Sequence, residues 1–149
     1  MDKAIRIFTD GSAIRNPGPG GWCVVLIQGR ERWEMSGAHL WTTISEMEPV
    51  AAVQALRPLP ARARMELHSD SEYLMHGMRA YALRLQRNGW RNWRGTPLQH
   101  RELWTELIEL NRILLIQWKW IKGHNDQTRA DKLAYEAARS LCVREKAAA

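Results

Sequence analysis

The opening third of the chain shows short apolar runs separated by turn-forming residues. Runs of strand length occupy residues 4–9 and 22–28. The segment 16–21 is rich in glycine and proline and is predicted to be a turn. A break near Gly29 indicates a tight hairpin into a third strand over about 31–40. The pattern therefore predicts that the chain begins with antiparallel hairpins.

Helical and strand-like patterns alternate over the rest of the chain. The first helix is expected to end near Leu56, before two prolines. Its start can use either of two capping boxes, Thr43 with Glu46 or Ser45 with Glu48. The later elements are expected in this order: a strand at 65–69, helices at 71–78, 81–87 and 101–111, a strand at 113–121 and a helix at 127–143. Because helices that separate strands favour parallel pairing, we expect an α/β fold with a mixed five-stranded sheet flanked by helices.

Length and composition bound the class of protein. The chain has 149 residues, 45% of them hydrophobic, which suits one domain over 1–145 followed by a frayed tail at 146–149. Lys and Arg number 22 against 16 Asp and Glu, which gives a net charge of +6. A basic domain of this size often binds a polyanion, usually nucleic acid, although solubility alone would also account for the charge.

The cysteines and the apolar segments argue against several other classes of protein. Cys23 and Cys142 are too few to indicate a disulfide framework or a zinc site, and Cys23 lies in an apolar run that predicts a core position. The chain lacks a signal-peptide pattern and the roughly 20 consecutive apolar residues of a membrane span. We therefore expect a cytoplasmic protein with no membrane partner, and its small size suggests a monomer.

Four acidic residues stand where an acid is costly unless it has a purpose. Asp10 and Asp70 each end a predicted strand, and Glu48 and Asp131 each lie near the front of a predicted helix. In open α/β sheets, sites gather beyond the strand ends, where neighbouring carboxylates repel each other unless a cation lies between them. Oxygen ligands favour Mg²⁺ or Mn²⁺, and a pair of such ions suits in-line attack of water on a phosphodiester.

Each of these acids also has a purely structural interpretation. An Asp after a strand commonly caps a turn or a helix. Glu48 can complete a capping box, and Asp131 can interact favourably with a helix dipole. The number of acids alone therefore does not separate a metal site from ordinary capping.

The segments around the acids carry more information, because they resemble the bacterial type I ribonucleases H. The matching segments, in the family's order, are FTDGS at 8–12, NPGPGGW at 16–22, ME at 47–48, SDSEY at 69–73, WKWIKGH at 118–124 and DKLA at 131–134. They span nearly the whole chain. The resemblance implies a ribonuclease H-like fold and an endonuclease that hydrolyses the RNA strand of RNA–DNA hybrids, leaving 5′-phosphate and 3′-hydroxyl ends.

The resemblance also implies roles for individual residues. Two Mg²⁺ ions, for which Mn²⁺ can substitute, would be coordinated by four acids: Asp10, Glu48, Asp70 and Asp131. His124, on the loop before the last helix, would assist proton transfer or product release. The RNA strand would meet the loop 11–16, with Gly11 and Asn16 at its ends, together with Glu48 and Glu72. The DNA strand would meet Asn16, Thr43 and Tyr81.

A stretch without acidic residues runs from Arg79 to Arg101. It carries arginines interleaved with aromatic residues: Arg79, Tyr81, Arg84, Arg87, Trp90, Arg91, Trp93, Arg94 and Arg101. Arginines grip phosphates and aromatic rings pack on sugars or bases, and the stretch resembles the family's basic protrusion, with Arg84 and Arg87 as contacts to the hybrid. The alternative is a solvated helix face whose tryptophans, Trp90 among them, belong to the core.

Several positions depart from the family's pattern, among them Glu46, Pro49, Glu72 and the pair Gln127-Thr128. Glu46 replaces a positive charge that binds substrate in many relatives, and Glu72 stands where relatives often have Gln. Pro49 follows Glu48 directly, so we expect the helix to start near Ser45 or to bend at Glu48. These departures keep open a catalytically weak or silent hybrid-binding domain of the same fold. An integrase-like or resolvase-like nuclease is disfavoured by the unbroken motif series, and a purely structural protein would leave the acids unexplained.

The departure at Glu46 yields a test. Glu46→Arg should tighten the binding of an RNA–DNA hybrid, because it replaces a charge that repels phosphate with one that attracts it. Fluorescence anisotropy with a labelled hybrid at low salt measures the effect. Equal dissociation constants for the variant and the wild type would contradict the expectation.

Overall fold

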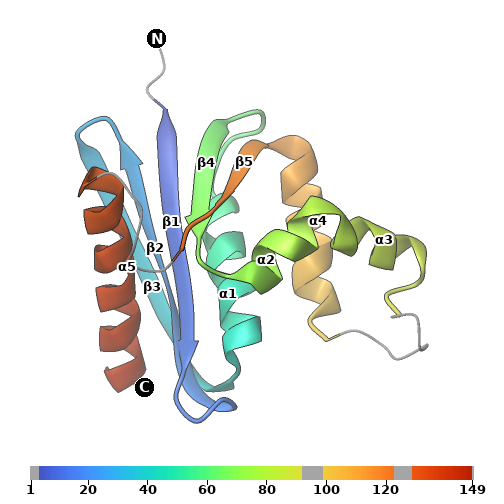
Figure 1. Ribbon diagram of the computed structural model, residues 1–149, viewed down its shortest axis with the longest axis horizontal. Coiled ribbons are helices and arrows are strands. Elements are labelled where there is room, and N and C mark those ends of the chain that lie inside the picture. The colour runs from blue at the N-terminus through green and yellow to red at the C-terminus, as the bar shows by residue number, and fades with distance from the viewer. Residues whose placement is uncertain (1–3, 92–98, 123–128, 149) are drawn as a thin grey trace.

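A five-stranded sheet in the order β3-β2-β1-β4-β5 forms the centre of the molecule (Figure 1). The computed structural model describes residues 4–91, 99–122 and 129–148. The strands are β1 (Ile5–Ala13), β2 (Gly18–Gln28), β3 (Glu31–Thr42), β4 (Arg64–Ser69) and β5 (Leu115–Trp120). The first three pair antiparallel, whereas β4 is parallel to both β1 and β5. The predicted mixed five-stranded α/β sheet is confirmed.

Helices cover the two faces of the sheet unequally (Figure 1). The helical elements are α1 (Ile44–Leu56), α2 (Glu72–His76), the π-helical turn η1 (Gly77–Tyr81), α3 (Ala82–Arg87), α4 (Arg101–Ile113) and α5 (Arg129–Ala148). On one face, Ile7 and Val24 join the core that contains buried residues of α1, α2 and α4. On the other face, Phe8 and Val25 pack with buried residues of α5. The period-two alternation of β1 and β2 therefore supplies both cores. In the part of the chain that is described, no helix is long and apolar enough to cross a membrane.

The structure corrects several predicted boundaries. β2 begins at Gly18, so the segment 18–21 is strand rather than turn. Gly20 is needed there for close packing, because a Cβ on it would lie 2.5 Å from the Ser12 carbonyl oxygen. Ile113 ends α4 instead of opening the last strand. The helix α5 continues to Ala148, beyond its expected end at Val143.

The start of α1 resolves the choice between the two capping boxes. Thr43 is the N-cap, and its hydroxyl accepts a hydrogen bond from the Glu46 N–H at 3.1 Å. The helix begins at Ile44, one residue before the expected start, and continues through Pro49 as its sixth residue. Pro49 has no N–H to donate to the Ser45 carbonyl, yet the helix is not interrupted. Glu48 is therefore not used for capping and is available to the site.

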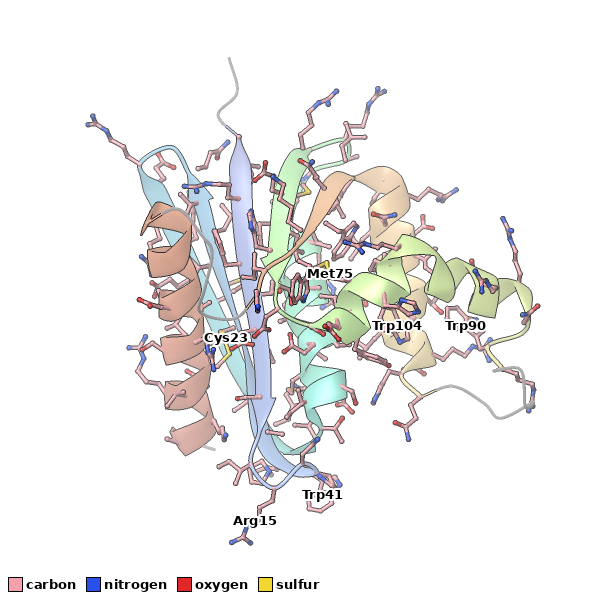
Figure 2. The ribbon with its side chains drawn as sticks, in the orientation of Figure 1. Arg15, Cys23, Trp41, Met75, Trp90 and Trp104 are labelled. Carbon is pink, nitrogen blue, oxygen red and sulfur yellow. A yellow bond between two sulfur atoms is a disulfide. The ribbon has the colours of Figure 1, made fainter. Side chains whose placement is uncertain are left out.

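A disulfide joins Cys23 of β2 to Cys142 of α5, which the sequence did not predict (Figure 2). The two residues are 119 positions apart, but packing of α5 on the sheet brings their Cα atoms to 5.3 Å. That separation lies within the usual range for a disulfide. Cys23 is fully buried, so its predicted core position is confirmed.

The disulfide should stabilise the fold, because it removes conformational entropy from an unfolded loop of more than a hundred residues. Reduction should lower the free energy of unfolding by about 2–4 kcal/mol. Urea unfolding of the wild type, with and without a phosphine reductant, measures this, and Cys23→Ser/Cys142→Ser should match the reduced wild type. A wild-type midpoint that reductant leaves unchanged would show that the disulfide adds nothing.

Candidate active site

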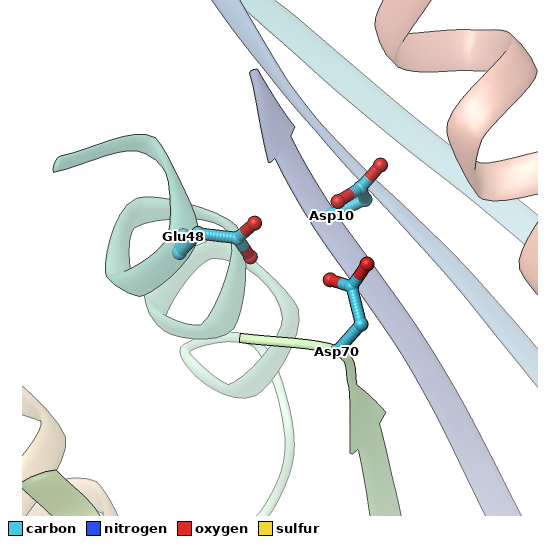
Figure 3. A group of neighbouring side chains, drawn as sticks. All are labelled: Asp10, Glu48 and Asp70. Carbon is cyan, nitrogen blue, oxygen red and sulfur yellow. The ribbon is translucent and has the colours of Figure 1, made fainter. Parts of the chain in front are cut away.

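Three carboxylates from separate elements meet at one edge of the sheet (Figure 3). Asp10 lies on β1, Glu48 on α1, and Asp70 directly follows β4. One carboxylate oxygen of each residue lies within 4.8 Å of those of the other two. Because β1 and β4 are parallel neighbours paired up to Phe8 and His68, Asp10 lies level with Asp70 where β4 ends, although β1 itself continues to Ala13 instead of ending at Asp10 as predicted. Three of the four acids singled out in the sequence are thus brought together.

Gly11 sets the distance between β1 and α1. A Cβ on Gly11 would lie 2.6 Å from the carbonyl carbon of Met47 and 2.7 Å from the amide nitrogen of Glu48. Both are backbone atoms, which a side chain cannot displace cheaply. The absent side chain therefore lets the helix backbone rest on the strand, which brings Glu48 close to Asp10. This packing role differs from the substrate contact expected for Gly11, which stays a prediction.

Burial and mutual repulsion make this cluster unfavourable for negative charge. Burial raises the pKa of Asp10 to about 6, and the charge of Asp70 adds to the rise. The pKa of Asp10 is lowered in part by Arg139, by the Gly11 N–H and by Glu48. Burial likewise raises the pKa of Glu48 well above its ordinary value. The negative charges of Asp10 and Asp70 raise it further, by smaller amounts. A cation between these groups would relieve both costs.

The donor set fits a hard divalent cation. All three groups offer carboxylate oxygen, the ligand that Mg²⁺ and Mn²⁺ prefer. Among the described residues, nothing forms a hydrogen bond with the Oε2 atom of Glu48, although that atom is buried. A buried carboxylate oxygen without a partner is expensive unless a ligand satisfies it. Glu48 therefore provides a coordinating atom that the protein itself leaves unused.

Arg139 of α5 also reaches this site, and sequence analysis missed it. Its Nε lies 3.9 Å from the Oδ2 atom of Asp10. A signal existed in the helical pattern, since Ala134, Ala138 and Cys142 form a buried stripe and Arg139 borders it. That the stripe packs beside Asp10, however, depends on the tertiary structure.

The candidate substrate residues occupy several separate places. Asn16 and Thr43 lie near each other, because the Asn16 side-chain oxygen accepts a hydrogen bond at 3.0 Å from the N–H of Ile44, the residue after Thr43. Glu72 is exposed at the start of α2, next to the N-cap Ser71. Arg84 and Arg87 are exposed on α3. The structure gives no contact with substrate, so these roles stay predictions.

Three predicted site residues are described only in part or not at all. His124 lies outside the described residues. Asp131 falls within α5 and Tyr81 within η1, but their side chains are not among those described. Their expected roles in catalysis, metal binding and substrate binding therefore stay predictions.

The basic stretch divides between core and surface. Trp90 is buried, which confirms the alternative interpretation for this tryptophan. Trp104, beyond the stretch, is also buried, and its indole N–H donates to the Tyr73 hydroxyl at 3.2 Å. Arg79 and Arg91, like the arginines of α3, are exposed. Glu46 lies against His100, the N-cap of α4, with 3.6 Å between Oε2 and Nδ1. Replacing Glu46 by Arg would therefore also remove this contact.

Comparison with known proteins gives one consistent family. A family model described as RNase H matches residues 2–139. The chain is 44% identical over 139 residues to a protein named Ribonuclease H from Symbiobacterium thermophilum, covering 91% of this chain and 95% of that protein. It is 42% identical over 143 residues to Ribonuclease H from Moorella thermoacetica, covering 93% and 94%. The fold is similar to that of LC9-RNase H1, a type 1 RNase H with the type 2 active-site motif, with a TM-score of 0.82, 22% identity, and coverage of 99% and 74%.

The shifted pKa of Asp10 predicts a pH dependence of stability in the absence of metal. The folded protein binds a proton on Asp10 up to about pH 6, whereas the ordinary value is 3.8, so the folded state binds more protons between these values. Stability in chelator should therefore fall as pH rises through this range. Urea unfolding from pH 4 to pH 7 should show the advantage of Asp10→Asn over the wild type growing with pH.

Glu102→Gln, at the exposed start of α4, is the control for loss of a surface carboxylate. A constant difference between Asp10→Asn and the wild type across this pH range would contradict the assigned shift.

Proposed function

The chain belongs to the RNase H family, and on this premise we propose that it is an endonuclease that hydrolyses the RNA strand of RNA–DNA hybrids with two Mg²⁺ ions. Its relatives at 42–44% identity, matched over most of their length, bear the name Ribonuclease H. The observation that carries the proposal is the meeting of Asp10, Glu48 and Asp70 at one edge of the sheet. Membership of a family does not by itself require an intact catalytic site. The cluster adds the carboxylate oxygens that metal-dependent hydrolysis needs.

The residues of the site divide the work between holding metal and holding substrate. Asp10, Glu48 and Asp70 would coordinate Mg²⁺, and we assign Asp131 of α5 as the fourth ligand. When bound, Mg²⁺ supplies activation of the attacking water and stabilisation of the leaving oxygen. Gly11 keeps Glu48 against β1. Cleavage would leave a 5′-phosphate and a 3′-hydroxyl, and His124 would move a proton or help the product to leave.

Recognition of a hybrid requires contacts with both strands. We assign the RNA strand to the segment from Gly11 to Asn16, to Glu48 and to Glu72, where the 2′-hydroxyl can be sensed. The DNA strand is assigned to Asn16, Thr43, Tyr81, Arg84 and Arg87. The hydrogen bond between Asn16 and the start of α1 supports this assignment, because it holds two of the DNA contacts as one unit. The exposed arginines of α3 supply phosphate binding that does not depend on sequence.

The silent hybrid-binding domain is the less favoured alternative. A domain that only binds has no need to hold three carboxylates together, two of them buried, at an energetic cost. Pro49, which had kept this alternative open, does not interrupt α1. Cleavage of a labelled hybrid in the presence of Mg²⁺ separates the endonuclease from the silent domain.

Asp10→Asn should abolish cleavage while retaining binding, because it removes a metal ligand without changing the shape of the side chain. We expect a loss of at least about a hundredfold in the rate of cleavage of a labelled hybrid in Mg²⁺. Anisotropy in chelator should give similar hybrid affinities for the variant and the wild type.

Glu102→Gln, at the exposed start of α4, is the matched control and should cleave normally. A wild type that binds the hybrid and never cuts it would favour the silent domain. Equal cutting of duplex DNA would favour a different nuclease.

A further inference from the structure

The three carboxylates of the site differ in how their backbones are held. Asp10 lies inside the β1–β2 ladder, and Glu48 lies inside α1. Asp70 belongs to neither a strand nor a helix, because β4 ends one residue before it and α2 begins two residues after it (Figure 3). Other groups must therefore hold its backbone if the carboxylate is to keep its place beside two acids.

Side chains hold the backbone on both sides of Asp70. The Ser69 hydroxyl accepts a hydrogen bond from the Ser71 N–H at 3.1 Å, which closes a turn around Asp70. The Trp120 indole N–H donates to the Asp70 carbonyl oxygen at 3.2 Å. Trp120 is the partner of Ser69 in the β4–β5 ladder, and the next residue of the chain, Ile121, donates its N–H to the Ser69 carbonyl at 2.9 Å. The indole therefore extends the pairing of β4 with β5 by one residue, as far as Asp70.

Packing alone does not account for Trp120. It is 43% exposed, whereas Trp118, two residues earlier on the same face of β5, is partly buried and packs against the core. A ring so far in solvent gains less from burial than a core tryptophan does. Its nitrogen, however, is bonded to the backbone of the carboxylate cluster. None of the metal or substrate contacts proposed for this chain involves Trp120.

We infer that Trp120 is a positioning residue for metal binding, whose indole N–H holds the backbone of Asp70 so that its carboxylate stays with Asp10 and Glu48. The inference rests on the proposed function, because it takes these carboxylates to be ligands of Mg²⁺. Their oxygens lie within 4.8 Å of one another, a distance at which ionised carboxylates repel. Without the indole hydrogen bond, Asp70 would be held less firmly against this repulsion, and Mg²⁺ would have to reorder it on binding.

The first test is a titration of the whole protein with Mg²⁺ alone, without nucleic acid, followed by NMR chemical shifts. Trp120→Phe keeps an aromatic ring and removes the N–H donor. It should bind Mg²⁺ roughly three- to tenfold more weakly than the wild type, the size expected for one hydrogen bond. Trp118→Phe is the matched control, because the Trp118 indole N–H donates at 2.8 Å to the Asn111 side chain of α4. It should lose stability through weaker packing and keep the Mg²⁺ affinity of the wild type.

Hydrogen exchange at the Trp120 indole nitrogen gives a second readout. The indole signal that disappears from the nitrogen–proton correlation spectrum of Trp120→Phe identifies it. If the hydrogen bond favours metal binding, metal binding must favour the hydrogen bond by the same factor. Mg²⁺ should therefore slow exchange of the Trp120 indole hydrogen in the wild type and leave that of Trp118 unchanged. Equal exchange of the Trp120 hydrogen with and without saturating Mg²⁺ would contradict the coupling.

Cleavage kinetics distinguish positioning from contact with nucleic acid. Trp120→Phe should need more Mg²⁺ than the wild type to reach its half-maximal rate, and should approach the wild-type rate when Mg²⁺ is saturating. Its KM for a labelled hybrid should be unchanged. A raised KM with an unchanged Mg²⁺ affinity would make Trp120 a contact for the hybrid and would overturn the inference.

The outcomes separate the two proposals. If the wild type binds Mg²⁺ and Trp120→Phe binds it equally well, the role of Trp120 is wrong and the metal-dependent function stands. The same holds if Trp118→Phe loses as much Mg²⁺ affinity as Trp120→Phe does. If the wild type binds no Mg²⁺ at millimolar concentration, both proposals fail.

Discussion

Mutual repulsion among buried carboxylates is the constraint around which this molecule is built. Asp10, Glu48 and Asp70 come within 4.8 Å of one another, and the first two are almost fully buried. Burial and like charge both raise the pKa of Asp10 and of Glu48, so the folded protein holds these acids at the expense of its own stability. Such an arrangement persists when function requires it, and a divalent cation is the ligand that converts the cost into binding energy.

The rest of the fold keeps these groups in place against their repulsion. Parallel pairing of β1 with β4 sets the two aspartates at one edge, and the bare backbone of Gly11 lets α1 approach β1 closely. Thr43 caps α1 at the correct residue, so that Glu48 projects toward the site. On the opposite face, the disulfide ties α5 to β2 beside Asp10. Each restraint comes from a different element, which makes the cluster a property of the whole sheet.

Hydrophobic patterning predicted the architecture well and the boundaries less well. The order of strands and helices followed from runs and periods of apolar residues, because burial on one or two faces is a local demand on the sequence. The prediction of a turn over 18–21 was wrong, and the reason is physical. Glycines there suggested a turn, but Gly20 is required by the close approach of Ser12 across the β1–β2 ladder. A glycine chosen for crowding and a glycine chosen for a turn look alike in sequence.

The sequence by itself determined the element order, the resemblance to a family and the identity of the acids, because motifs and periodicity are local. Only the tertiary structure decided that Glu48 is spared from capping, that Cys23 bonds a cysteine 119 residues away, and that Arg139 reaches Asp10. These facts depend on how α1 and α5 pack against opposite faces of one sheet. Contacts across such distances leave no periodic trace in a single chain, since their energy depends on through-space geometry rather than on spacing along the backbone.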